Sequence, residues 1–186
     1  MKLTVNDDLI DLAQVFAKNN ATLYIVGGFV RNAILGFCET DIDVCSRLLP
    51  DEIEHILPAK KYAVKLINAK LGTVHITVKS TGQEYEHTTF RAEVYNAGGN
   101  HSPESVRFVD DMALDASRRD FTANAIYYDI LGGEFVDYYN GVTDVKAHIL
   151  RTVETPEYVF SRDGLRILRL VRIANELNFT IDEHTF

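Results

Sequence analysis

Cysteine and long apolar runs are scarce in this sequence. Its 186 residues include two cysteines, Cys38 and Cys45, and neither belongs to a CxxC motif or another paired-ligand pattern. A zinc site and a disulfide scaffold are therefore not expected. No stretch approaches the roughly 18 consecutive apolar residues of a membrane span, and acidic residues stand where a signal peptide needs an apolar run. We expect a cytoplasmic protein with no membrane partner.

Positive charge is also scarce. The chain carries 19 Lys and Arg against 27 Asp and Glu, which gives a formal net charge of −8. Neutralisation of phosphates is the main source of affinity for nucleic acid, so this charge counts against a protein that wraps nucleic acid over its whole surface. Arginines nevertheless concentrate towards the C-terminal end, between Arg151 and Arg172. This distribution predicts a local electrostatic site within an acidic shell.

Hydrophobic periodicity predicts an α+β domain and the beginning of a second domain. Helices are expected over residues 7–18, 29–35, 50–57 and 120–128 and beyond Pro156. Strands are expected at residues 23–26, 40–45, 62–67, 73–78, 84–90 and 149–153. Helices occur only at intervals between these strands, which favours an α+β sheet over a doubly wound one. Residues 92–106 are rich in Asn, Gly and Ser and are expected to form a mobile loop.

Asp41 and Asp43 are the first candidates for catalysis. Alternate side chains of a strand project from one face, so both carboxylates are expected on the same side, roughly 7 Å apart at Cα. Such oxygen ligands suit Mg²⁺, which one or two carboxylates hold together with substrate phosphates. The alternative, a solvated strand edge or turn, is the commoner role of an isolated Asp-x-Asp pair.

Gly27 and Gly28 follow a predicted strand and open a predicted helix. Backbone amides at a helix start bind phosphate, and Arg31, one turn inside, can reach the same group with a fork of donors. The alternative is a tight turn beside a surface arginine. The position of this motif within about 15 residues of the aspartate pair favours a nucleotide site.

Glu84, Glu86 and Thr88 share one face of a later predicted strand. Glu86 is our candidate for a third catalytic carboxylate, and the alternative is the solvated face of an edge strand. His75 and His87 have no metal-ligand partners at useful spacing and are expected to be ordinary sheet residues.

Two further groups pair charge with helix. Arg119 precedes a predicted helix whose first turn carries Asp120 and Asn124, where arginine can contact phosphate or base and the other two can organise the sugar. The alternative is an Asp-capped helix with solvated arginines. Downstream, one helical face carries the candidates for base reading and triphosphate binding, which are Asp163, Arg166, Arg169 and Arg172. The alternative is a solvated basic helix face.

In this order, the segments closely resemble the class II CCA-adding enzymes and their bacterial poly(A) polymerase relatives, which are polymerase-β-like nucleotidyltransferases. The resemblance rests on six ordered motifs: residues 24–31 with Leu35-Gly36, residues 40–43, 85–91, 118–125, 137–141 and 162–172. Each motif alone has low specificity, but the probability that all six occur by chance in this order is very small.

The resemblance implies a nucleotidyltransferase head with a five-stranded mixed sheet over residues 1–137, followed by the start of a helical neck over residues 138–186. It implies that Asp41 and Asp43 bind Mg²⁺, and that Asp163 and Arg166 read the base of CTP or ATP. It implies further nucleotide contacts at Gly28, Arg31 and Arg119, and support of the triphosphate by Arg169 and Arg172. Gly27, Asp120 and Asn124 are nucleotide-binding candidates from the residue patterns given above. The implied partners are CTP, ATP and the tRNA 3′ end; oligomeric state is not predicted.

Three departures from the family pattern stand out. Arg162 occupies the position before Asp163, where the family usually has Glu. Family members carry further neck, body and tail domains that grip tRNA, and this chain stops at Phe186. The loop after Ala92 lacks the basic residues often found there, although its length matches enzymes that add A as well as C.

Two rival functions remain open at this point. Bacterial poly(A) polymerases share these motifs but resemble one another in a basic stretch where this chain has Leu71-Gly72-Thr73-Val74, which favours CCA addition. A non-catalytic nucleotide-binding or RNA-binding module would fit the short length and the acidic charge. The expected reaction is attack of the RNA 3′ hydroxyl on the α-phosphate of CTP or ATP, with release of pyrophosphate.

Overall fold

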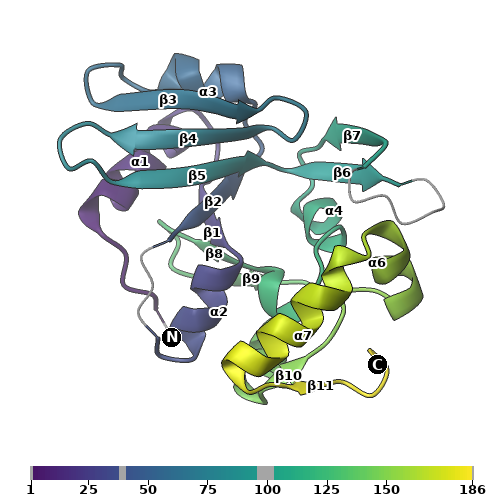
Figure 1. Ribbon diagram of the computed structural model, residues 1–186. Helices are drawn as coiled ribbons and strands as arrows, with labels where there is room; N and C mark the ends of the chain where they lie inside the picture. Colours follow the sequence, from purple (N-terminus) through teal and green to yellow (C-terminus); the bar gives the residue numbers. More distant parts are fainter. Residues whose placement is uncertain (1, 38–40, 96–102, 186) are drawn as a thin grey trace.

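The computed structural model describes residues 2–37, 41–95 and 103–185. A mixed seven-stranded sheet with the order β3-β4-β5-β2-β1-β8-β9 forms its centre (Figure 1). Its strands are β1 (Tyr24–Val26), β2 (Asp43–Ser46), β3 (Tyr62–Asn68), β4 (Thr73–Val78), β5 (Glu84–Thr89), β8 (Ile126–Asp129) and β9 (Phe135–Asp137). Within this sheet only the pair β2 and β5 is parallel. The α+β class and the mixed sheet are confirmed.

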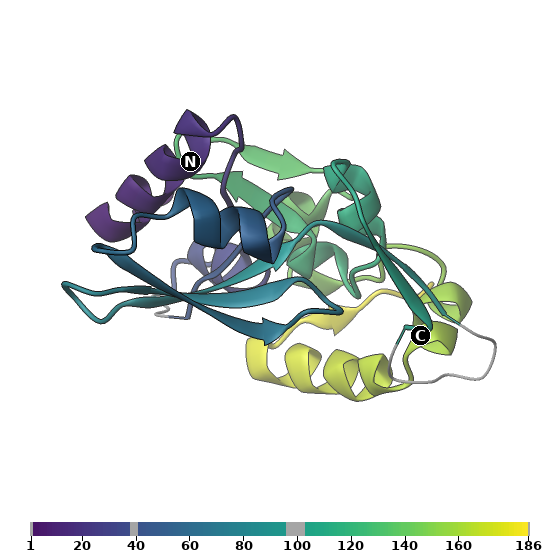
Figure 2. The same ribbon diagram turned by 90° about the horizontal axis from the view of Figure 1, so that it is seen from above.

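Helices lie on both sides of the sheet. Figure 2 shows α1 and α3 on one side and α7 on the other. The helices are α1 (Asp7–Lys18), α2 (Gly28–Ile34), α3 (Pro50–Ile56), α4 (Met112–Ser117), α5 (Gly141–Lys146), α6 (Pro156–Arg162), α7 (Leu165–Leu177) and the short 3₁₀ helix η1 (Thr122–Asn124). Two small pairs complete the described part: β6 (Arg91–Val94) with β7 (Ser105–Phe108), and β10 (Ile149–Leu150) with β11 (Thr180–Ile181).

The prediction of a helix over residues 120–128 is wrong, and with it the expected number of five strands. After η1 the chain enters β8, which pairs with β1 on one side and β9 on the other. Ile126, Tyr127 and Tyr128 are fully buried. Residues of this kind favour a strand that is covered on both faces. β8 and β9 therefore extend the five predicted strands to seven.

Two other expectations need correction. Residues 92–106 are not all loop, because β6 and β7 form an antiparallel hairpin that begins at Arg91 and ends at Phe108; residues 96–102 of the predicted loop lie outside the described residues. The chain beyond Pro156 is not all helix either, because α6 and α7 are separated at Asp163 and β11 follows α7.

One hydrophobic cluster joins the sheet, its helices and the C-terminal elements. Helix α1 contributes Leu9, Leu12 and Phe16 at helical spacing, and its start is capped by Asn6, whose side chain accepts a hydrogen bond from the Leu9 amide. Leu170 and Ile173 of α7 belong to the same cluster. The core therefore holds α7 at a set position beside the sheet.

None of the helices built from the described residues has the length and apolar character needed to cross a bilayer.

Candidate functional site

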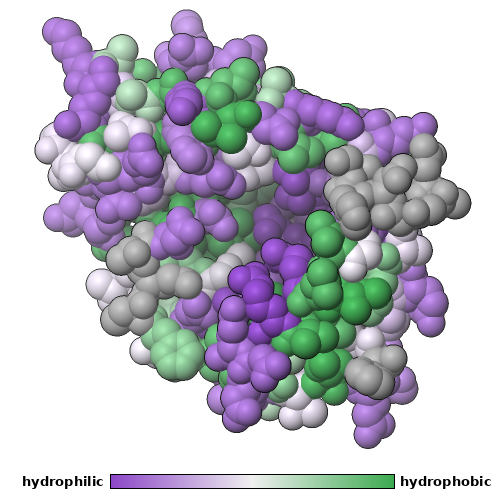
Figure 3. Space-filling model, in the orientation of Figure 1, coloured by the Kyte–Doolittle hydropathy of each residue, from purple (hydrophilic) through white to green (hydrophobic). Residues whose placement is uncertain are grey.

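A cavity of about 590 Å³ lies between the sheet and α7. Figure 3 shows this face of the molecule hollowed, with hydrophilic residues in the recess. Among the described residues, seven arginines, six carboxylates and no lysine line it. The cavity lining is thus slightly positive within a chain of net charge −8. Guanidinium groups bind phosphate and carboxylate oxygens through paired donors, which a lysine ammonium group cannot do. The arginine-rich lining therefore suits a polyanionic ligand.

Most predicted site residues line this one cavity. They come from α2 and the turn before it, from the start of β2, from the η1 region, and from α7 and its junction with α6: Gly27, Gly28, Arg31, Asp41, Asp43, Arg119, Asp120, Asn124, Asp163, Arg166, Arg169 and Arg172. Residues 28 and 172 are far apart in sequence, so only the fold brings these groups together. Glu86 is the one predicted site residue that does not line the cavity.

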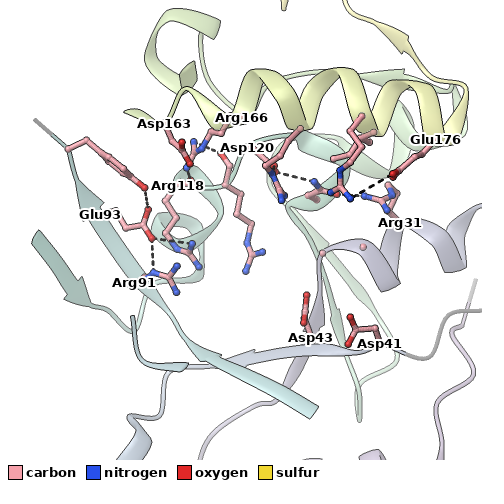
Figure 4. Close-up of a pocket in the computed structure, with 18 residues that line it drawn as sticks. Arg31, Asp41, Asp43, Arg91, Glu93, Arg118, Asp120, Asp163, Arg166 and Glu176 are labelled. Carbon is pink, nitrogen blue, oxygen red and sulfur yellow. Dashed lines mark hydrogen bonds and ion pairs between the residues drawn. The ribbon is translucent and has the colours of Figure 1, made fainter. Parts of the chain in front are cut away.

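Asp41 and Asp43 lie next to each other on the sheet side of the cavity, which both side chains line (Figure 4). Asp43 is the first residue of β2, and Asp41 lies just before the strand rather than within it. Both are exposed, whereas Ile42 between them is buried at 6% exposure. The predicted alternation is therefore confirmed, because the buried isoleucine turns the two carboxylates to the opposite face.

The glycine turn lies next to this pair. Gly27 has φ +80°, a backbone conformation that residues with a side chain rarely adopt. A Cβ at this position would lie 3.7 Å from Asp43 Oδ2. Glycine is thus required by the backbone angle, while space alone would admit a methyl group. The main chain at Gly27 and Gly28 therefore borders the cavity within reach of whatever the aspartates bind.

Glu86 lies beside Asp43 but faces another partner. The two residues are register partners in the parallel pair β2 and β5, so their side chains lie on one face of the sheet. The Glu86 carboxylate, however, lies 3.2 Å from His75 Nε2 across β4 and β5. Among the described residues no group of three or more His, Cys, Asp and Glu is placed to hold a metal ion.

A chain of polar contacts crosses the cavity from α2 to α7. Arg31 Nη1 donates to Asn124 Oδ1 at 2.6 Å, Asn124 Nδ2 donates to Asp120 Oδ1 at 3.1 Å, and Arg169 Nε donates to Asp120 Oδ2 at 2.7 Å. Burial by itself raises the pKa of Asp120, but Arg169 and the hydrogen bonds from Asn124 and the Phe121 amide bring it below its usual range. The carboxylate is therefore charged near neutral pH and organises its neighbours.

Arg119 is held more tightly than the sequence indicated. Its Nε donates to Tyr127 Oη at 2.9 Å and its Nη2 to Asp115 Oδ2 at 3.0 Å, and the guanidinium lies over the Tyr127 ring. Asp115 is 1% exposed and also binds Arg118 at 2.8 Å. Burial opposes its ionisation, but Arg118 and Arg119 outweigh burial and hold the pKa of this carboxyl well below its usual range. Arg119 thus lines the cavity as part of a buried ionic network.

The candidate base-reading residues lie at the junction of α6 and α7. Arg166 is 8% exposed, and its Nη2 donates to the Arg118 carbonyl at 2.7 Å. Asp163 ends α6 with extended backbone angles, and its Oδ1 accepts a hydrogen bond from the Leu165 amide at 3.0 Å. Both side chains line the cavity at the end away from Asp41 and Asp43 (Figure 4). A ligand that spans the cavity would contact the aspartate pair at one end and this junction at the other.

Several lining residues received no role from sequence reasoning. They are Arg91, Glu93, Tyr95, Arg118, Ile173 and Glu176. Arg91 Nε donates to Glu93 Oε1 at 2.7 Å, and both side chains are largely buried. Their spacing of two residues places them on one face of β6. That spacing could have indicated the pair only if residues 91–94 had been predicted as a strand. The position of the β6 hairpin over the cavity had no such signal.

Comparisons with known proteins identify the family of this chain. The family model described as Poly A polymerase head domain matches residues 23–151. The chain is 38% identical over 162 residues to a CCA-adding enzyme of Lactobacillus helveticus, which covers 87% of this chain and 39% of the relative. It is 41% identical over 162 residues to a CCA-adding enzyme of Levilactobacillus brevis, and this match covers 87% of this chain and 39% of the relative.

Solved structures show the same likeness. The crystal structure of the Bacillus stearothermophilus CCA-adding enzyme in complex with CTP superposes with a TM-score of 0.82 at 33% identity, and the match covers 95% of this chain and 40% of the other. The chain thus spans about two fifths of the length of these relatives. From the family match over most of the chain we conclude that this protein belongs to the poly A polymerase head domain family, as its resemblance to class II CCA-adding enzymes predicts.

Proposed function

We propose that this chain is the catalytic part of a tRNA nucleotidyltransferase that adds C and A from CTP and ATP to the tRNA 3′ end. One observation carries the proposal: the aspartate pair, the glycine turn and the Asp163–Arg166 pair line a single arginine-rich cavity. The CTP complex of the similar B. stearothermophilus enzyme supports a nucleoside triphosphate as ligand. Cytoplasm, where both substrates occur, is the location that we expect.

Asp41 and Asp43 fit a divalent metal, which we propose to be Mg²⁺. Two exposed carboxylates on one face, with cavity space before them, form a donor set that leaves positions for water and phosphate oxygens. When bound, such a metal makes the attacking hydroxyl more nucleophilic and stabilises the leaving oxygen. The role of the two side chains is to hold this charge where the α-phosphate and the RNA 3′ hydroxyl meet.

The other lining residues bind and orient the substrate. Arg31 and Arg169 lie at opposite ends of the Asn124–Asp120 link, so one hydrogen-bonded unit presents two guanidinium groups to the triphosphate. Asp163 offers acceptors and Arg166 a planar donor group, the equipment that distinguishes one base edge from another. In this proposal residues 1–137 form the catalytic head and residues 138–186 the start of the neck that selects the nucleotide.

The test compares the wild-type protein with Asp41→Asn and Asp43→Asn, using tRNAs that end before and within the CCA and each labelled nucleotide in turn. We expect both variants to lose more than the roughly 10- to 100-fold that removal of an indirect metal-supporting residue costs. Their unfolding temperatures should stay unchanged because both carboxylates are exposed. Glu86→Gln belongs in the same series: a loss equal to that of Asp43→Asn would identify a third catalytic carboxylate, and a small loss would place Glu86 outside the reaction.

The same assay separates the rivals. Repeated addition of A to tRNA or other RNA, without C, indicates a poly(A) polymerase. Nucleotide binding that is independent of Mg²⁺, with no pyrophosphate released by the wild type, indicates a non-catalytic binding module. Near-wild-type incorporation by folded Asp43→Asn would contradict the proposed mechanism.

A further inference from the structure

Arg162 is the last residue of α6, directly before Asp163, and it stacks on two tyrosines. Its guanidinium carbon lies over the Tyr158 ring at 3.6 Å from the ring centre and over the Tyr95 ring at 5.6 Å. Its Nη2 also donates to the Tyr158 hydroxyl. Tyr158 precedes Arg162 by one helical turn, whereas Tyr95 follows β6 and lines the cavity. Arg162 thus joins the α6–α7 junction to the β6 hairpin.

Tyr95 is itself anchored in the cavity wall. Its hydroxyl donates to Glu93 Oε2 at 2.6 Å, and Glu93 Oε1 accepts from Arg118 at 3.4 Å. Burial, followed by the Glu93 contact, raises the pKa of Tyr95 to about 12, so the phenol keeps its proton for this bond. The main-chain carbonyl of Arg118 accepts from Arg166. Arg162 and Arg166 are therefore tied to the same wall by two separate routes.

Asp163 lies between these two tethered arginines. Its backbone angles, φ −148° and ψ 105°, interrupt the helix, and only Asp163 and Gly164 separate α6 from α7. The direction of its carboxylate depends on how α6 is oriented relative to α7. Tethering Arg162 on one side and Arg166 on the other restricts that orientation.

We propose that Arg162 is a positioning residue for nucleotide selection, which holds Asp163 through the cation–π stack with Tyr95 and Tyr158. The inference rests on the proposed function, in which Asp163 reads the base. An acidic side chain at position 162 would meet the negative faces of both rings instead of being attracted by them. In this chain arginine therefore stabilises the junction through contacts that a carboxylate cannot make.

The test measures the ratio of kcat/KM for CTP to that for UTP, and the ratio of their Kd values, in Arg162→Glu. We expect both ratios to fall about three- to tenfold, the range that a cation–π contact of ordinary strength supports. Tyr158→Leu should have the same effect, whereas Tyr158→Phe keeps the ring and should keep most of the selectivity. Arg107→Glu, the same charge reversal on exposed β7, should leave both ratios unchanged.

A double-mutant cycle separates positioning from simple loss of structure. In an Asp163→Ala background, Arg162→Glu should change the ratios no further, because Asp163 is the group through which Arg162 acts. Unchanged ratios in Arg162→Glu, or additive effects in the double mutant, would overturn the proposal. If the wild-type protein incorporates no nucleotide but still binds CTP in preference to UTP, the proposed function alone is overturned. Absence of nucleotide binding by the wild type would overturn both.

Discussion

Gly72 is a residue whose side chain is excluded by both backbone and space. It has φ +67°, and a Cβ there would lie 2.6 Å from Phe108 Cε1 and 2.9 Å from the Thr89 side chain. At the level of sequence, the segment from Leu71 to Val74 favoured CCA addition over poly(A) polymerase activity. The structure gives its glycine a packing role: it lets the chain turn into β4 beneath the β6–β7 hairpin that borders the cavity.

Gly72→Ala should lower the free energy of unfolding by roughly 2–4 kcal/mol, because left-handed backbone strain and steric overlap add together. Gly82→Ala is the matched control, since Gly82 has φ +75° and its Cβ would meet nothing within 4 Å. That variant should lose only about 1 kcal/mol from strain. Urea unfolding of both variants measures the difference, and equal losses would show that the contact with Phe108 and Thr89 relaxes without cost.

At the scale of elements, Asp115 joins three of them. It lies in α4, accepts from the Arg91 amide of β6 at 3.1 Å, and accepts from the Tyr127 hydroxyl of β8 at 2.6 Å. Arg118 and Arg119 complete its shell. The network fixes the cavity wall that carries Arg118 and Arg119, so its loss should disturb stability and nucleotide binding together.

Asp115→Asn should destabilise the protein by about 3 kcal/mol or more, because it leaves buried guanidinium groups with one partner fewer. Asp11→Asn makes the same change in an ion pair with Lys61 whose side chains are 41% and 48% exposed, and it should cost less than about 1 kcal/mol. Chemical unfolding measures both variants. A loss as small at Asp115 as at Asp11 would contradict the structural role of the network.

The errors of prediction also belong to the scale of elements. β1 to β5 follow from local alternation and apolar runs, because each side chain pattern is visible within one segment. β8 does not, since Asp120 looks like a helix cap and the buried run from Ile126 to Tyr128 has no period of its own. What makes it a strand is the presence of β1 and β9 on either side, which no local pattern reports.

For the whole molecule, acid stability depends on a histidine buried in the core. His87 Nε2 lies 2.8 Å from Ser46 Oγ, its ring lies against Phe16, and burial lowers its pKa from 6.5 to about 3. Between these two pKa values, His87 is protonated in the unfolded chain and neutral in the folded chain. Stability from this group is therefore present above pH 6.5 and is lost progressively as pH falls towards 3. The pKa values of Asp115 and Asp120 are lowered from 3.8, so the stability from these carboxylates is present above that pH and is lost as pH falls further.

Unfolding free energy measured at pH 6, 5 and 4 should accordingly fall by about 1 kcal/mol for each pH unit because of His87. His87→Leu should remove this part of the slope, whatever its effect on absolute stability. His184→Leu, the same change at an exposed site, should keep the wild-type slope. An unchanged slope in His87→Leu would show that other groups control the acid response.

The sequence by itself determined the family, the first five strands, the helix over residues 7–18 and the aspartate pair on one face, because repeating patterns and short motifs are local properties. Only the tertiary structure decided which charged groups meet. It turned Glu86 towards His75, enclosed Arg119 with Asp115, and stacked Arg162 on Tyr95. The physical reason is that a side chain's partners are set by segments distant in sequence, and their approach follows from packing of the whole core rather than from any single motif.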